Sequence, residues 1–248
     1  MNRSKRLMVV AVLGGALALS GCSDSDDGGG GTATVQLDLQ VIEFEPGADT
    51  DPPFEGAEVC VADTTNCGTS DADGMVTLQI PANSELELLV TAEGYGPTLT
   101  PQTTTDEDIT TQQTPLISDA TLTVLAGALG TEYPLGENGL VALSVLTAPI
   151  TADNNGIAGV TLTPDPAATV YYLDENEIPR TDISATTEPS GAGGLIEVAP
   201  GTYELELGAT ASNCVVVAGW PGSSASSVSL PVRAGFITQG FMTCDSVP

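Results

Sequence analysis

Apolar and polar residues alternate with a period of two along most of the chain. The alternation is clear at 35–41, 76–80 and 86–90, and it returns at 141–145, 203–207 and 228–232. Such alternation is typical of strands that bury one face. Turn residues separate the segments, among them Asp73-Gly74 and Pro200-Gly201. Short strands with frequent turns favour a β-sandwich over a parallel sheet.

One order of features occurs twice along the chain. A turn glycine, an alternating segment, a proline turn and a second alternating segment follow one another at 74–88 and again at 194–207. In both copies the sequence Glu-Leu-Glu-Leu begins at the same offset from the proline. The repeat therefore predicts two related β-sandwiches in tandem, each large enough for a core of its own.

A single helical pattern lies between the two copies, at 118–129. Ser118 is a suitable N-cap, Gly130 can end the helix, and apolar residues recur on one face. That face consists of Leu122, Leu125, Ala126 and Leu129. We expect the helix to pack against the second sandwich. The preceding Thr-, Gln- and Asp-rich stretch predicts a linker at 101–117, between a first sandwich at 34–100 and a helix plus second sandwich at 118–248.

The first copy resembles the carboxypeptidase regulatory-like domain. The resemblance rests on Gly56-Ala57-Glu58-Val59, Asp71-Ala72-Asp73-Gly74, Pro81 and Gly94-Tyr95, and it covers about residues 34–100. It implies a seven-stranded transthyretin-like sandwich of the carbohydrate-binding-like group, acting as a non-catalytic accessory module. Residues 140–246 resemble the family more loosely, because they lack the Asp-x-Asp-Gly turn. The expected fold class is mainly β, with two tandem transthyretin-like or immunoglobulin-like sandwiches and one short helix.

The N-terminus has the features of an export signal. Three basic residues precede a short apolar stretch at 7–19, which ends in Leu19-Ser20-Gly21-Cys22. This ending resembles the lipobox of bacterial lipoproteins. The resemblance implies a signal peptide at 1–21, lipid on Cys22, and a flexible Gly/Asp tether over 22–33. Ser23 resembles the default signal for outer-membrane delivery, so we expect a membrane-anchored protein at the cell surface.

Four cysteines remain after Cys22, and three disulfide pairings are open to them. Disulfides persist outside the cytosol. We favour Cys60–Cys67 and Cys214–Cys244, because each pair then lies within one predicted sandwich. Zinc does not fit these spacings, and the chain has no histidine.

The charge balance excludes several functions. The chain has 33 acidic and 5 basic residues, and removal of 1–21 leaves two bases, Arg180 and Arg233, for a net charge of −31. Nucleic acid needs basic patches, so it is not an expected partner. Without histidine or, after cleavage, lysine, the usual Ser-His, Cys-His and lysine mechanisms are impossible. We expect no enzyme, and only a carboxylate-dependent hydrolase remains as a remote alternative.

Two ligand classes are alternatives to a purely structural role. Calcium would use Asp71-Ala72-Asp73-Gly74, but the EF-hand register then puts Thr69 and Ile80 at its end positions, so we expect a hairpin turn and no metal site. Sugars would stack on aromatic rings, for which Trp220 is the best candidate, ahead of Tyr95, Tyr171 and Tyr172. The first hypothesis is a structural or interaction module without a cofactor. Carbohydrate binding is the alternative.

Overall fold

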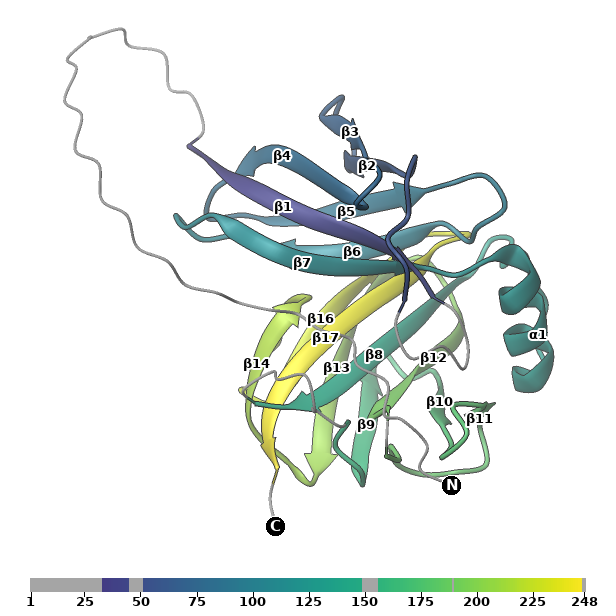
Figure 1. Cartoon of the computed structure of the whole chain (residues 1–248). Helices are drawn as coiled ribbons and strands as arrows, with labels where there is room; N and C mark the ends of the chain where they lie inside the picture. The colour runs from purple at the N-terminus through teal and green to yellow at the C-terminus, as the bar shows by residue number, and fades with distance from the viewer. Residues whose placement is uncertain (1–32, 45–50, 149–155, 189, 247–248) are drawn as a thin grey trace, which may run out of the picture.

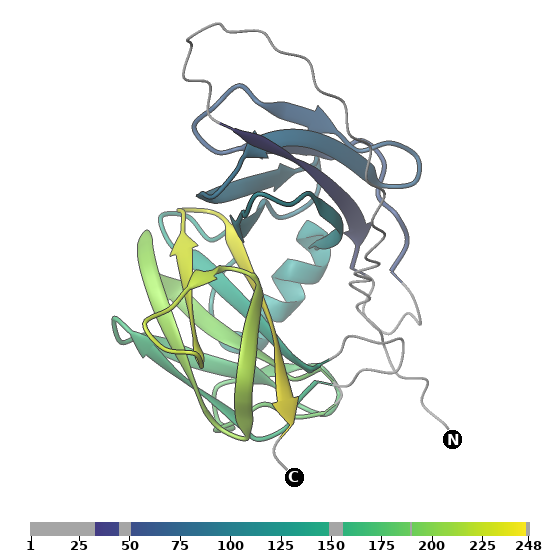
Figure 2. The same cartoon turned by 90° about the vertical axis from the view of Figure 1, so that its left-hand side faces the viewer.

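Figure 1 shows a computed structural model of the chain, which describes residues 33–44, 51–148, 156–188 and 190–246. Strands make up most of these residues, and one short helix accompanies them, so the expected mainly β fold is confirmed. Two β-sandwiches lie one above the other, and the helix lies beside their junction in both views (Figures 1 and 2).

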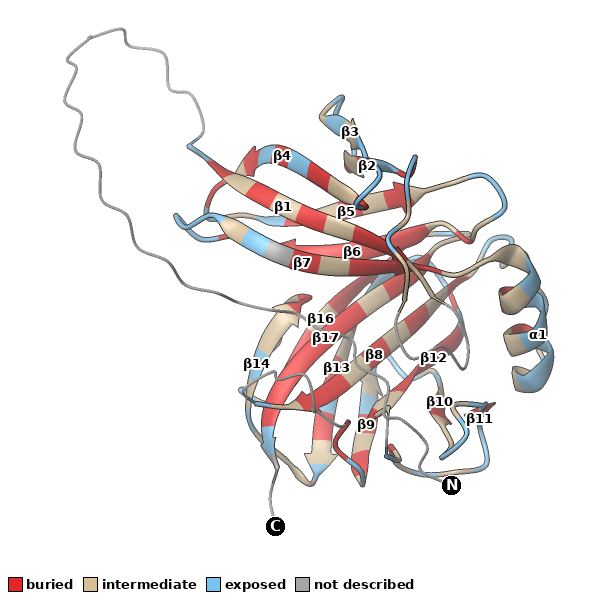
Figure 3. Ribbon diagram, viewed as in Figure 1, coloured by how far each residue is buried: buried red, intermediate tan, exposed pale blue. Residues whose placement is uncertain are grey.

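The first sandwich packs two sheets face to face. The smaller sheet has the order β4-β1-β7, and it faces strands in the order β6-β5-β2-β3. Alternation along β1 explains the packing, because its apolar residues are buried and the polar residues between them are not (Figure 3). The strands are β1 (Thr34–Glu43), β2 (Glu58–Val61), β3 (Cys67–Thr69), β4 (Met75–Pro81), β5 (Glu85–Thr91), β6 (Thr98–Thr103) and β7 (Ile109–Leu116).

The stretch predicted as a linker is part of the first sandwich. The structure corrects that prediction for 101–117, because β6 pairs with β5 and β7 pairs in parallel with β1. Apart from Leu116, the buried core-facing residues of these two strands are polar, and this is why the alternation of apolar residues does not reveal the strands. The polar ones are Thr98, Thr100, Gln102, Gln112 and Thr114.

The second sandwich has the same two-layer plan. One sheet has the order β15-β16-β13-β9, and the other runs β11-β10-β12-β8-β17, with β14 also paired to β17. The two sandwiches have separate apolar cores, centred for example on Leu39 and on Leu205. The strands are β8 (Gly139–Thr147), β9 (Val160–Asp165), β10 (Thr169–Leu173), β11 (Pro179–Arg180), β12 (Ala192–Val198), β13 (Gly201–Ala209), β14 (Ala211–Ala218), β15 (Trp220–Pro221), β16 (Ser227–Val232) and β17 (Ile237–Ser246).

One sheet runs through both sandwiches. Strand β17 pairs in parallel with β6, with Ile237 opposite Thr98 and Thr238 opposite Leu99, and this joins the strands into a ten-stranded sheet. Additional backbone bonds cross the junction, from Ile237 N to Pro97 O at 2.9 Å and from Gly219 N to Pro101 O at 2.8 Å. The geometry between the sandwiches is therefore fixed by main-chain pairing as well as by side chains.

Helix α1 (Asp119–Leu129) follows its sequence pattern closely. Ser118 caps it by accepting a hydrogen bond from Thr121 N, and Gly130 ends it with a φ of 72°, in the left-handed region. The predicted apolar face is the less exposed one, with Leu122 and Ala126 buried. Contacts with both sandwiches correct the expectation that the helix packs against the second one alone: Asp119 N donates to Gly94 O, and the helix also packs against β11.

Candidate functional site

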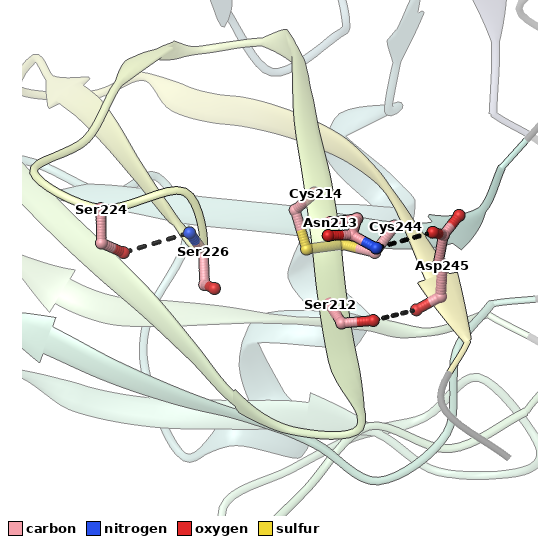
Figure 4. Close-up of a disulfide and its surroundings, with 7 residues drawn as sticks. All are labelled: Ser212, Asn213, Cys214, Ser224, Ser226, Cys244 and Asp245. Carbon is pink, nitrogen blue, oxygen red and sulfur yellow. Dashed lines mark hydrogen bonds between the residues drawn. A yellow bond between two sulfur atoms is a disulfide. The ribbon is translucent and has the colours of Figure 1, made fainter.

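Both predicted disulfides are present. Cys60–Cys67 links β2 and β3 at directly paired positions, with 4.1 Å between the Cα atoms. Cys214–Cys244 links β14 and β17, with a Cα separation of 4.0 Å (Figure 4). Each bond lies within one sandwich, as the sequence analysis expected. Cys22, the predicted lipidation site, lies outside the described residues.

The two candidate metal-binding groups of the described residues take part in other interactions. Within the described ranges, Glu58, Cys60 and Cys67 form the cluster with metal-ligand spacing, but the two sulfur atoms are bonded to each other and only a carboxylate remains. The Asp71 carboxylate accepts hydrogen bonds from Asp73 N and Met75 N, both at 2.9 Å. Gly74 has a φ of 73°, which suits a hairpin turn. This acidic sequence thus makes a turn.

The candidate aromatic residues are engaged in packing. Trp220 is half-buried in β15, and its Nε1 donates to Leu86 O of the first sandwich at 3.3 Å. Tyr171 and Tyr172 are buried, and the Tyr95 hydroxyl donates to Glu43 at 2.6 Å while its ring lies edge-on to Phe54. A sugar platform needs an exposed ring face. The geometry therefore gives no support to carbohydrate binding through these residues.

Arg233 connects the two sandwiches electrostatically. From the turn after β16, its Nη2 lies 2.6 Å from the Asp63 carboxylate and its Nε lies 2.5 Å from that of Glu87. Its guanidinium lowers the pKa of Asp63, mainly through the side-chain hydrogen bond. The other cation of the body, Arg180, pairs within the second sandwich with Asp182 at 2.6 Å. The sequence alone gave no sign of the Arg233 contact.

Carboxylate pKa values bear on the remote hydrolase alternative. A general acid at neutral pH needs a raised pKa. Among the described carboxylates with a resolved shift, Asp63, Asp182 and Glu204 all have lowered pKa values. For Glu204 the main cause is the hydrogen bond donated by the Ser223 hydroxyl. Hydrogen bonding in each case favours the ionised form, which suits a solvated acidic surface.

A groove of about 400 Å³ lies where the two sandwiches meet. The end of β6 forms one wall, strand β14 forms another, and the turn between β15 and β16 encloses it. Figure 4 shows β14 between this turn, which carries Ser224 and Ser226, and strand β17. The lining side chains are uncharged: apart from the amide of Gln102, they are small, apolar or hydroxyl-bearing. They include Gln102, Thr103, Val216, Val217, Ser224 and Ala225.

Buried polar residues continue from the groove into the first sandwich. Thr100 Oγ1 and Thr114 Oγ1 are 3.2 Å apart, and they join the core faces of β6 and β7. Gln102 and Gln112 lie two positions along from these threonines, and both are more than nine-tenths buried. Gln102 Oε1 has no hydrogen-bond partner in the structure, nor has either polar atom of the Gln112 amide. Because buried polar atoms without partners are rare, these glutamines mark an unusual region.

Comparisons with known proteins yield only distant structural similarity. No protein-family model and no curated protein matches the chain. The minor pilin GBS52 of Streptococcus agalactiae aligns at 11% identity over 86% of this chain and 97% of the pilin, with a TM-score of 0.28. The shaft pilin SpaA of Lactobacillus rhamnosus GG aligns at 12% identity over 87% of this chain and 100% of the pilin, with a TM-score of 0.26. Similarity at this level carries no functional conclusion.

Proposed function

We propose that this protein is a non-catalytic surface lipoprotein that acts as a structural or interaction module. The observation that carries the proposal is the shared ten-stranded sheet, because it fixes two sandwiches in one geometry. Two sandwiches held in one geometry are suited to presenting a rigid surface to a partner, while the predicted flexible tether over 22–33 leaves their distance from the membrane variable. The lipobox-like Leu19-Ser20-Gly21-Cys22 supports attachment at the N-terminus. The described residues include no helix long and apolar enough to cross a membrane.

Attachment is tested by the variant Cys22→Ser. Without the thiol no diacylglycerol can be added, so the variant should lose radiolabelled lipid and leave the membrane fraction. Ser23→Ala is the matched control, since it keeps Cys22 and the three residues before it. A Cys22→Ser protein that stays labelled and membrane-bound would show that the anchor lies elsewhere.

The interaction role is tested by display on the cell surface. Whole cells should expose the body to an added protease or antibody, and the purified body should show no hydrolysis of glycans or peptides. Hydrolysis that disappears when a carboxylate is replaced by its amide would contradict the non-catalytic role. A glycan and peptidoglycan screen tests the carbohydrate alternative, which requires binding that Trp220→Ala abolishes.

A further inference from the structure

Strand β14 (Ala211–Ala218) has hydrogen-bonded neighbours on one side only. It pairs with β17, and among the described strands it has no second partner. Its backbone N–H and C=O groups on the other edge are a template for an added strand. Val215 on this strand is 60% exposed, one of the most exposed large apolar residues of the described chain. The free edge therefore combines unpaired main-chain groups with an apolar side chain.

The groove between the sandwiches lies along this strand. Cys214, Val216 and Val217 of β14 line it, and Ala225 lines it from the turn between β15 and β16. Val217 also packs against a small apolar cluster made by Leu146, Ala218 and Phe241, so this part of the groove rests on a packed apolar base. An apolar base beside a strand edge suits an extended peptide, whose alternate side chains point toward the base.

Gln102 brings an unpaired hydrogen-bond acceptor to the lining of this groove. Its side chain is 6% exposed and lines the groove, yet its Oε1 accepts no hydrogen bond in the structure. A buried acceptor without a partner destabilises the structure that holds it. Because Oε1 is itself enclosed, a bound segment satisfies it with a main-chain N–H only if the Gln102 amide turns toward the groove. The main chain of a peptide carries such a donor at nearly every residue.

Electrostatics select the charge of the occupant. Both cations of the body are held in ion pairs, Arg180 with Asp182 and Arg233 with Glu87 and Asp63. Two carboxylates are hydrogen-bonded to residues in or next to the lining of the groove. Glu206 accepts from the hydroxyl of the lining residue Ser224 at 2.8 Å. Asp245 accepts at 3.0 Å from Asn213, which precedes the lining residue Cys214 (Figure 4). An anionic partner is repelled by such a surface, and a cationic partner is attracted to it.

We infer that the groove beside β14 binds an extended, cationic peptide segment of a partner protein, which adds to the free edge of this strand. The inference rests on the proposed interaction function and names the surface that performs it. Main-chain hydrogen bonds to β14 supply affinity, apolar side chains contact Val216 and Val217, and basic side chains reach the carboxylates around the groove.

The test uses the full body after the signal peptide and a short peptide of alternating valine and lysine. Isothermal titration should show binding that weakens as salt is added, because charge attraction contributes to it. Backbone amide shifts should change at β14 and at the end of β6. The same peptide with alternate amides N-methylated should bind at least about tenfold more weakly, since edge pairing needs those N–H groups.

Matched variants of the protein locate the site. Ala225→Trp fills the groove from an exposed turn and should weaken binding of the valine–lysine peptide at least about tenfold. Ala128→Trp places the same side chain on an exposed position of α1 and should leave binding unchanged. Val215→Lys places a positive charge at the β14 edge, which repels the lysines of the peptide and should weaken binding. Val124→Lys places the same charge at an exposed valine of the helix and should leave binding unchanged.

Four results would overturn the inference, and three of them are comparisons. First, a valine–glutamate peptide binds as tightly as the valine–lysine peptide. Second, the helix control variants lose as much binding as the groove variants. Third, the N-methylated peptide binds as tightly as the unmethylated one. Absence of any binding would also overturn it. None of these results touches membrane attachment, which Cys22→Ser tests separately, so the groove can fail while the proposed surface module stands.

Discussion

At the scale of single residues, Arg233 joins the two sandwiches through ion pairs, in addition to the main-chain pairing at their junction. It pairs with the largely buried carboxylate of Glu87, which is 16% exposed, and with the exposed one of Asp63. Replacing it with glutamine leaves Glu87 without a counter-charge in a body with a net charge of −31. We expect Arg233→Gln to lower the free energy of urea unfolding by about 1 kcal/mol.

The control for this prediction is Arg180→Gln, because the carboxylate partners of Arg180 are in its own sandwich. It should change stability little. Arg233 lowers the pKa of Asp63 in the folded protein. The contact between them therefore stabilises the fold fully above the ordinary aspartate pKa. This stabilisation is lost as the pH falls through the lowered pKa and the carboxylate becomes protonated. The wild-type advantage over Arg233→Gln should therefore shrink in acid, and equal stability of both proteins at neutral pH would contradict the role of the joint.

Gln112 offers a second test at this scale. It is 5% exposed, and neither polar atom of its amide has a partner in the structure. Methionine has nearly the same shape without the polar atoms. Gln112→Met should therefore raise the free energy of unfolding by about 1 kcal/mol. In Gln113→Met the change removes a hydrogen bond to Gln40, so stability should fall instead. A loss in both variants would mean that the Gln112 amide is hydrogen-bonded in solution.

At the scale of elements, the first sandwich needs strands that a boundary at residue 100 removes. A fragment of residues 34–100 ends inside β6 and lacks β7, which pairs with β1 along most of its length. We expect this fragment to be unfolded, with its amide proton NMR signals confined to a narrow range of chemical shifts. A fragment of residues 33–117 keeps β1–β7 and the Cys60–Cys67 bond, and it should melt cooperatively. Folding of the shorter fragment would show that β7 is dispensable.

Sequence patterns predicted the elements whose buried faces are apolar. Strands β1, β4 and β5 and the helix with its Ser118 cap are found where alternation and capping indicated. The same patterns do not predict β6 and β7, because polar residues such as Thr100 and Thr114 occupy core-facing positions in these strands. The ring chemistry of Trp220 suits sugar stacking, but which groups surround the ring depends on pairing between segments far apart in the sequence. Its bond to Leu86 O spans 134 positions and has no local signal.

At the scale of the whole molecule, the charge balance sets the response to salt. Residues 22–248 contain two arginines and 33 acidic residues, so repulsion among the carboxylates dominates the long-range electrostatics. Added sodium chloride screens this repulsion, and the melting temperature should rise with salt. The difference between wild type and Arg233→Gln should fall over the same range, because the attractive ion pair is screened as well. A melting temperature that falls with salt would contradict this balance.

The position of β17 in the chain also constrains the order of folding. This strand pairs with β6, β8 and β14, and every one of these partners precedes it in the sequence. A chain that emerges N-terminus first therefore exposes the facing edges of β6 and β8 unpaired until β17 follows. The seam between the sandwiches closes only when β17 has been made, so the exposed strand edges must be protected from aggregation until almost the whole chain has emerged.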